Sequence, residues 1–178
     1  TLMDDYLNDL QVVQEFASLN RAVILDELVR GMKWKVLDSQ ECIHNYVDVS
    51  EDTIETFGSP MLRKGAISAK NNEKVIIPIN MRDGIILGTG RGNTDWNCSA
   101  PHGSGRIMKC EDIKNHYAVS SYKSEMKGIY SSCIGKETLD EAPFAYRALD
   151  EIAEVIGETV TIHKVIRPVY NFKAGNER

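Results

Sequence analysis

Apolar residues recur at three- and four-residue spacings through the first part of the chain. The stripe consists of Leu7, Leu10, Ala17, Ile24 and Leu28, widened by Val13, Phe16 and Leu25. This periodicity predicts one long helix over residues 4–30, with Gly31 at the position of a C-terminal cap. Such a stripe is typical of core packing, so we expect this face of the helix to be buried.

Short runs rich in isoleucine and valine follow the helix and predict strands. The runs are KWKVLDSQE (33–41), CIHNYVDVS (42–50), GAISA (65–69), KVIIPI (74–79), GIILGTG (84–90), KGIYSSC (127–133) and TVTIHKVIRPVYNFKA (159–174). The segment EDIKNHYA (111–118) predicts a short helix between them.

Residues 142–155, APFAYRALDEIAEV, predict a second helix near the C-terminus. Pro143 suits its first turn, and Asp140 or Glu141 is a candidate cap. Strands thus follow one helix and precede another instead of alternating with helices. This order predicts an α+β fold, with a mixed, sheet-rich core flanked by the long N-terminal helix and the second helix.

The composition favours some classes of protein and argues against others. The chain has 178 residues, 42% of them hydrophobic and 26% charged, with a formal net charge of -5. These values suit one globular domain and argue against a simple basic nucleic-acid-binding module, although they allow a local basic pocket. The four cysteines form no C-x-x-C pair, which indicates reduced thiols in a cytoplasmic protein. No apolar run approaches a membrane span and no signal peptide is visible, so we expect no membrane partner.

Two short motifs suggest binding chemistry without establishing it. GTGRGN (88–93) resembles a phosphate loop, but it lacks a G-K-[ST] ending, so a turn between strands is the better interpretation. DWNC (95–98) brings a carboxylate and a thiol near His102, which would suit a divalent metal, yet nothing in the spacing fixes the loop. His116 and His163 are interpreted as ordinary helix and strand residues.

The segment NCSAPHGSGR (97–106) carries the most specific chemistry. Gly103 and Gly105 would let the backbone approach a ligand closely, and Ser104 with successive backbone N–H groups could form an anion nest. Arg106 could bind a phosphate through its two-pronged guanidinium. In such surroundings the imidazole of His102 could attack a phosphorus atom and hold a phosphoramidate.

These residues resemble the H-G-[AS]-G-R motif of the RtcB-type RNA-splicing ligases, in particular their shorter bacterial branch. Further segments resemble the family in the same order along the chain. They are FASLNR (16–21), HNYV (44–47), RKGAISA (63–69), IIPINMRDG (76–84), GRGNTDWNCSAPHGSGRIM (90–108), DEAPFAYR (140–147) and RPVYNFKAG (167–175). The resemblance therefore covers essentially the whole chain, 1–178, as the C-terminal portion of an RtcB-like ligase domain.

The resemblance implies a specific reaction. Family enzymes use GTP and Mn²⁺ to join RNA ends that carry a 3'-phosphate or 2',3'-cyclic phosphate to ends with a 5'-hydroxyl, in tRNA splicing and RNA repair. The motif histidine attacks the α-phosphate of GTP and becomes guanylylated. The GMP then passes to the RNA 3'-phosphate, and the 5'-hydroxyl displaces it. An archease-type activator is a further expected partner.

Carried onto this chain, the resemblance assigns roles residue by residue. His102 would be the catalytic nucleophile, His44 a manganese ligand, and Arg106 a contact to RNA phosphate. The nucleotide-binding set would be Asn45, Pro78, Ile79, Asn80, Met81, Gly103, Ser104, Gly105, Tyr146 and Lys173.

The chain also departs from the family pattern. The Asp-x-x-Cys, Asn-His-x-x-Glu and H-S-G-S-R-like motifs, which precede this region in the family, are not present. Lys109 and Cys110 stand where Ser and Arg are expected, Ile79 and Asn80 replace Gly-Ser, and Ile85 replaces a serine.

Three hypotheses follow from the sequence. The chain is part of an RNA ligase that needs an N-terminal half supplied by another segment or chain. Alternatively, it is a catalytically inactive RtcB-like remnant that serves as a nucleotide-binding or protein-interaction module. The third is an unrelated α+β domain. Sheet edges and apolar faces that normally meet the N-terminal half would favour self-association of the chain alone.

Overall fold

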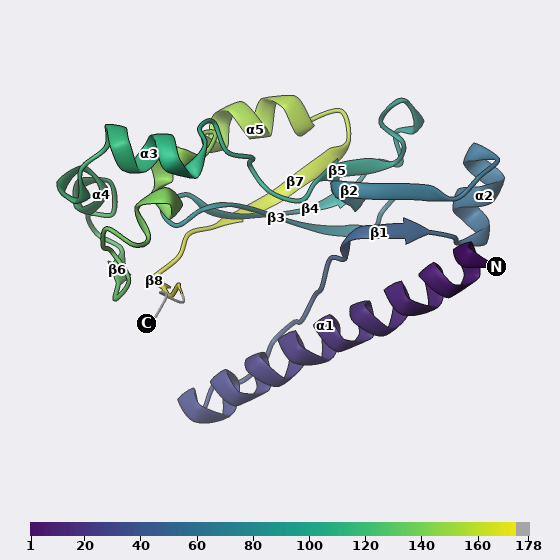
Figure 1. Cartoon of the computed structure of the whole chain (residues 1–178), viewed down its shortest axis with the longest axis horizontal. Coiled ribbons are helices and arrows are strands. Elements are labelled where there is room, and N and C mark those ends of the chain that lie inside the picture. The colour runs from purple at the N-terminus through teal and green to yellow at the C-terminus, as the bar shows by residue number, and fades with distance from the viewer. Residues whose placement is uncertain (174–178) are drawn as a thin grey trace. The chain divides into compact units, whose positions relative to one another are not determined.

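The computed structural model describes residues 1–173, which fold into two compact units. The first unit contains residues 1–41 and 45–63, and the second contains residues 42–44 and the chain from residue 64 onwards. The fold combines helices with antiparallel strand pairs and a long N-terminal helix (Figure 1), so the predicted α+β class is confirmed.

The elements appear in Figure 1 under the following labels and bounds: α1 (Leu2–Met32), β1 (His44–Asp48), α2 (Glu51–Phe57), β2 (Met61–Ser68), β3 (Lys74–Asn80), β4 (Gly84–Gly90), η1 (Thr94–Trp96), β5 (Ser99–Pro101), α3 (Cys110–His116), α4 (Val119–Glu125), β6 (Tyr130–Ser131), η2 (Leu139–Glu141), η3 (Pro143–Ala145), α5 (Leu149–Ile156), β7 (Val160–Ile166) and β8 (Tyr170–Asn171).

Helix α1 confirms the long predicted helix but ends differently. Thr1 and Asp4 form a capping box at its start, where two backbone N–H groups would otherwise lack acceptors. Gly31 lies inside the helix, and the C-terminal cap is Lys33, with φ 55 in the left-handed region. The predicted cap at Gly31 is therefore wrong.

The expectation that α1 buries an apolar stripe is also wrong, since none of its residues is buried. Apolar side chains such as Val12, Phe16, Val23 and Leu28 are more than half exposed, and Leu28 lies on another side of the helix from the other three. Helices that are apolar on several sides are normally covered by a larger core. The described residues of the first unit do not cover α1 in that way.

Two three-stranded sheets contain most of the strands, and the pairs β2–β5, β3–β4 and β4–β7 are antiparallel. One has the strand order β3-β4-β7, with Ile77 opposite Ile86 and Thr89 opposite Thr161. The other has the order β1-β2-β5, and β2 pairs with β5 so that Ala66 lies opposite Pro101. A short parallel pair, β6 with β8, lies near the C-terminal end of the described chain.

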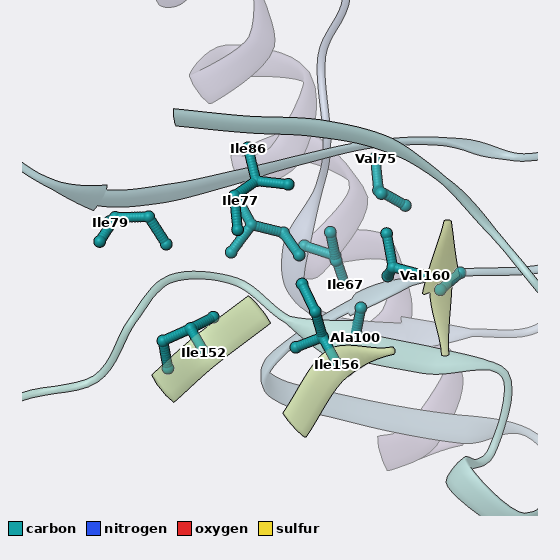
Figure 2. Packing of buried hydrophobic residues seen from close by; sticks show 10 residues of the cluster. Ile67, Val75, Ile77, Ile79, Ile86, Ala100, Ile152, Ile156 and Val160 are labelled. Atoms are coloured by element: carbon teal, nitrogen blue, oxygen red, sulfur yellow. The ribbon is translucent and has the colours of Figure 1, made fainter. Parts of the chain in front are cut away.

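The main core of the second unit lies between the strands and helix α5. Figure 2 shows Ile152 and Ile156 of α5 directed toward isoleucines of the sheets, among them Ile77 and Ile67. Ile77 and Ile86 are completely buried. This packing holds β5 beside α5, and β5 leads directly into the loop that contains His102.

A second apolar cluster forms around α3, α4 and the segment 139–145. Tyr122 lies at its centre and donates its hydroxyl to the sulfur of Met81, with an O–S distance of 2.9 Å. Burial is the main cause that raises the pKa of Tyr122 to about 12. The cluster supports the segment that carries Glu141 and Tyr146.

Two element predictions are wrong. Residues 33–41 form no strand, and their apolar side chains Trp34, Val36 and Leu37 are exposed. The helix predicted over 142–155 begins only at Leu149, with Ala148 as its N-cap, so neither Asp140 nor Glu141 caps it. The other strand segments and the short helix at 111–118 are confirmed, although the strand predicted at 127–133 contains only two residues.

The late start of α5 has a tertiary cause. Ile107 donates its backbone N–H to the carbonyl of Ala145, and Arg147 donates to the carbonyl of Gly105. These bonds draw residues 145–147 into an extended pairing with the loop after His102. Contacts with residues that are distant in the sequence thereby override the helical periodicity of residues 142–148.

Candidate functional site

The loop from His102 to Arg106 is tied to two strands. The N–H of His102 lies 3.4 Å from the carbonyl oxygen of Gly65 in β2, and the N–H of Ser104 lies 3.1 Å from that of Pro78 in β3. The hydroxyl of Ser104 donates to the carbonyl of Ile79 at 2.7 Å. These backbone and side-chain bonds hold the loop in one place, as a reactive side chain requires.

The predicted nucleophile and the predicted metal ligand lie side by side in the structure. The rings of His44 and His102 stack with centroids 5.0 Å apart and an interplanar angle of 18°. Gly65, with φ 67, lies next to them, and a Cβ atom there would be 3.6 Å from Cε1 of His102. The glycine supplies a left-handed backbone and leaves the space beside the imidazole open.

A cavity of about 670 Å³ opens beside the loop and joins most of the residues predicted to bind nucleotide. Its walls include Pro78, Ile79, Asn80, Met81, His102, Gly103, Ser104, Gly105, Arg106, Glu141, Tyr146 and Lys173. Segments widely separated in the sequence therefore converge on one space large enough for a nucleotide.

Several of these residues also stabilise the fold. The side chain of Ile79 is buried in the main core, as Figure 2 shows, and the side chain of Met81 is buried against Tyr122. Asn80 accepts from the backbone N–H groups of Arg82 and Asp83 and thereby shapes the turn between β3 and β4. The side chains of Ile79 and Met81 are thus packing groups.

Glu141 is the site residue that the sequence interpretation missed. One carboxylate oxygen accepts from the hydroxyl of Tyr146 at 2.9 Å and from the Lys173 ammonium at 2.9 Å. The other accepts from Arg106 at 2.5 Å, whose guanidinium lies 5.0 Å from the centre of the Tyr146 ring. Glu141 lies in the DEAPFAYR segment, but only the fold shows that residues 106, 146 and 173 meet there.

The electrostatics of this cluster favour an ionised Glu141. Burial alone would raise the pKa of its carboxyl, but hydrogen bonds from Lys173 and Tyr146 outweigh it, so the pKa of Glu141 is lowered. Burial and the hydrogen bond to that carboxylate both raise the pKa of the Tyr146 hydroxyl, which therefore stays protonated. The far end of the cavity thus presents the positive charges of Arg106 and Lys173 and the negative charge of Glu141 in fixed positions.

Lys173 reaches Glu141 because the segment before it is fixed. Asn171 donates its side-chain amide to the carbonyl of Met81 at 2.7 Å, and its own carbonyl accepts from Ser131 at 3.0 Å. The family-like segment RPVYNFKAG runs past Lys173, and its last two residues lie outside the described residues.

Two further predicted site residues, Arg106 and Asn45, lie in different surroundings. Arg106 donates to the carbonyl of Asp140 as well as to Glu141, so its guanidinium is directed at this cluster. Asn45, in β1, belongs to the first unit and has φ 58. Its role near a nucleotide stays a prediction.

The segment GTGRGN forms the end of β4 and a turn, as the preferred interpretation held. A Cβ atom on Gly90 would lie 2.3 Å from the backbone of Ala69, and the N–H of Gly92 donates to the Ala69 carbonyl. These glycines are needed where two backbone segments pass close together.

A complete metal site is not formed by the residues that the structure describes. No group of three or more His, Cys, Asp or Glu side chains that could hold an ion occurs among residues 1–173. The DWNC segment therefore gains no third ligand there, and His44 and His102 alone are too few donors for Mn²⁺. Cys110 and Cys133 form no disulfide. Across that same range, no helix has both the length and the apolar character to span a membrane.

Comparison with known proteins matches this chain to the same family over nearly its whole length. The family model described as tRNA-splicing ligase RtcB matches residues 1–174. The RNA-splicing ligase RtcB of Escherichia coli is 28% identical over 179 residues, covering 93% of this chain and 43% of that protein. The tRNA-splicing ligase RtcB of Pyrobaculum aerophilum is 25% identical over 195 residues, covering 92% and 40%. The chain therefore spans less than half the length of these curated relatives.

Proposed function

Because this chain belongs to the tRNA-splicing ligase RtcB family, we propose that it supplies the nucleotide-transfer half of an RNA ligase that uses GTP. The RNA substrates would be one end with a 3'-phosphate or 2',3'-cyclic phosphate and one end with a 5'-hydroxyl. The observation that carries the proposal is the position of His102 in a fixed loop at the wall of a nucleotide-sized cavity.

His102 is the proposed nucleophile. Its neutral imidazole attacks the α-phosphorus of GTP, a nitrogen–phosphorus bond forms, and pyrophosphate leaves. An oxygen of the RNA 3'-phosphate then takes the GMP group from the histidine. Finally the 5'-hydroxyl attacks the phosphorus of the activated RNA end, and GMP departs. Gly65 leaves space around the ring for these transfers.

The other end of the cavity is proposed to hold the guanine base. Tyr146 offers a ring, Lys173 a donor to a carbonyl oxygen, and Glu141 an acceptor for N–H groups. A purine with a carbonyl and adjacent N–H donors, as in guanine, fits this combination better than adenine does. The sequence predicted a contact between Arg106 and RNA phosphate. We propose that the main role of Arg106 is to orient Glu141.

Mn²⁺ is the metal implied by the family resemblance, and its site is incomplete within the described chain. His44 would contribute one imidazole, and further ligands would have to come from outside these residues. A bound Mn²⁺ would neutralise phosphate charge.

The partner that completes the site is proposed to be the remaining part of an RtcB-like protein, on the same or another chain. An archease-type activator is a second proposed partner, and self-association of this chain a third. The alternative function, nucleotide or protein binding without turnover, is favoured by one observation: residues 1–173 lack a three-ligand metal cluster.

A ligation assay tests this proposal. Two RNA strands, one ending in a 3'-phosphate and one beginning with a 5'-hydroxyl, are incubated with GTP, Mn²⁺ and the chain. A second chain with the Asp-x-x-Cys and Asn-His-x-x-Glu motifs is present or omitted. We expect joined RNA only with both chains, and none with His102→Ala. Failure to join RNA with both chains present, while GTP still binds, would support the alternative.

A further inference from the structure

We propose that a second cavity, which shares the wall formed by residues 102–105 with the first, binds the base beside the reacting end of an RNA strand. The inference rests on the proposed function, since it names the place where the RNA lies relative to the nucleotide. The second cavity has a volume of about 530 Å³ and lies between strands β2 and β5, segment η1 and helix α5.

The two cavities differ in chemistry. The first ends in the charged cluster of Glu141, Lys173 and Arg106. The second is walled mainly by apolar groups, among them Ala100, Ile152 and Val155. The hydrogen-bonding edge of guanine suits the charged cluster of the first cavity, whereas the flat, weakly polar face of an RNA base suits the second.

Trp96 gives the second cavity a stacking surface. Its side chain lines the cavity and is 49% exposed. The indole N–H donates to the carboxylate of Glu158 at 2.9 Å, which holds the ring in one orientation. The next two residues, Asn97 and Cys98, have φ 52 and φ 46, so the backbone turns sharply directly after the tryptophan. A fixed, half-exposed aromatic ring is the usual platform for an unpaired base.

Arg147 supplies a cation on the same cavity wall. Its side chain is 51% exposed and pairs with Glu151 in the first turn of α5. An ion pair this exposed contributes little to stability, so exchanging the carboxylate for an RNA phosphate costs little. A guanidinium binds phosphate oxygens in pairs, which suits the backbone of the same nucleotide.

The position beside His102 explains why an RNA end would lie here. Both cavities border the same imidazole. A base held in the second cavity would therefore bring the adjoining RNA 3'-phosphate close to the GMP group on His102. Its oxygen then enters on the side of the phosphorus opposite the imidazole, which is the leaving group.

Tryptophan fluorescence tests this inference directly, because the chain has two tryptophans. In a Trp34→Phe background, Trp96 is the remaining one, and a short oligoribonucleotide with a 3'-phosphate should quench its emission. Trp96→Ala should weaken binding of that RNA by roughly 5- to 100-fold. Trp96→Phe, which retains an aromatic ring, should keep most of the affinity. Trp34→Ala is the matched control, since Trp34 is also exposed and lies in the first unit.

The readouts separate this inference from the proposed function. If GTP labels His102 but RNA binds equally well to Trp96→Ala and Trp34→Ala, the second cavity is not an RNA site and the proposal fails. If RNA quenches Trp96 and the variants behave as expected while no GTP label forms, the RNA site stands and the guanylylation chemistry fails. Circular dichroism of each variant confirms that a loss of binding is not a loss of fold.

Discussion

His44 and His102 come from segments 58 positions apart by their residue numbers, yet their imidazole rings stack with centroids 5.0 Å apart. His44 begins β1, and His102 directly follows β5. Strand β2, which lies between β1 and β5 in their sheet, supplies Gly65 beside the His102 ring. The pair therefore depends on the sheet for its geometry, and each prediction below follows from this site or its supports.

Gly65→Val should remove guanylylation of His102. The added side chain would extend toward an imidazole that already lies 3.6 Å from the Cβ position, and the left-handed backbone would be strained. The strain should lower the free energy of unfolding by about 1–2 kcal/mol. Labelling with GTP and chemical denaturation measure the two effects separately.

Gly58→Val is the matched control for Gly65→Val. Gly58 has φ 73, but no atom lies within 4 Å of its Cβ position. It should lose similar stability and keep its labelling. Equal labelling by the two variants would show that Gly65 does not govern the space around His102.

His44→Ala should raise the Mn²⁺ concentration that labelling of His102 by GTP requires. If His44 donates one imidazole to the ion, its removal should raise the half-saturating Mn²⁺ concentration by about tenfold or more. His163→Ala is the control, because His163 is bonded to Thr89 in the β4–β7 pairing. A titration of labelling against Mn²⁺ that gives the same midpoint for both variants would remove His44 from the metal site.

Glu141→Gln should change how stability depends on pH. The folded pKa of Glu141 lies below its ordinary value of 4.5, since the hydrogen bonds from Lys173 and Tyr146 outweigh the burial that would raise it. The stability that the carboxylate contributes is then fully present above pH 4.5 and is lost as the pH falls through the folded pKa. The variant should be less stable by about 1–2 kcal/mol near neutral pH.

Thermal unfolding at neutral and at acidic pH measures this effect. The difference in melting temperature between the parent chain and Glu141→Gln should shrink as the pH drops below 4.5. Glu137→Gln replaces an exposed carboxylate in the same region and should show no such trend. A difference that stays constant with pH would mean that the charge of Glu141 is not what holds the cluster.

The chain alone should self-associate through α1. Phe16 is 70% exposed, Leu19 is 64% exposed and Val12 is 66% exposed, and the helix has no buried residue. Apolar surface of this extent favours association. Light scattering should show a mass that rises with concentration, and Phe16→Glu with Leu19→Glu should reduce it. A concentration-independent monomer would contradict this expectation.

Local pattern predicted the long helix, the strands at 74–79 and 84–90 and extended structure from residue 159, because these segments carry strong periodicity and clear turns. It failed at 142–148, where the backbone of Ala145 and Arg147 bonds to the loop after His102. It also failed for the burial of α1, because periodicity reports an apolar face and does not say what covers it.

The candidate site was predictable where residues lie in one motif and not where they meet through the fold. His102, Gly103 and Ser104 stand together in the sequence, and the loop is formed as expected. Glu141 was considered only as a helix cap, although it binds Arg106, Tyr146 and Lys173. A single sequence gives no signal that pairs residue 141 with residue 173, so only the structure shows that these side chains meet at Glu141.

The most direct test of the account is covalent labelling by GTP. The chain, or its His102→Ala variant, is incubated with α-labelled GTP, Mn²⁺ and the second chain that carries the Asp-x-x-Cys and Asn-His-x-x-Glu motifs, and acid-labile label on the chain that carries residue 102 is measured. We predict label on the parent chain and none on His102→Ala, since the fixed loop places a nucleophilic imidazole at the cavity wall. Label that survives in His102→Ala, or a parent chain that binds GTP without becoming labelled, would contradict the central claim.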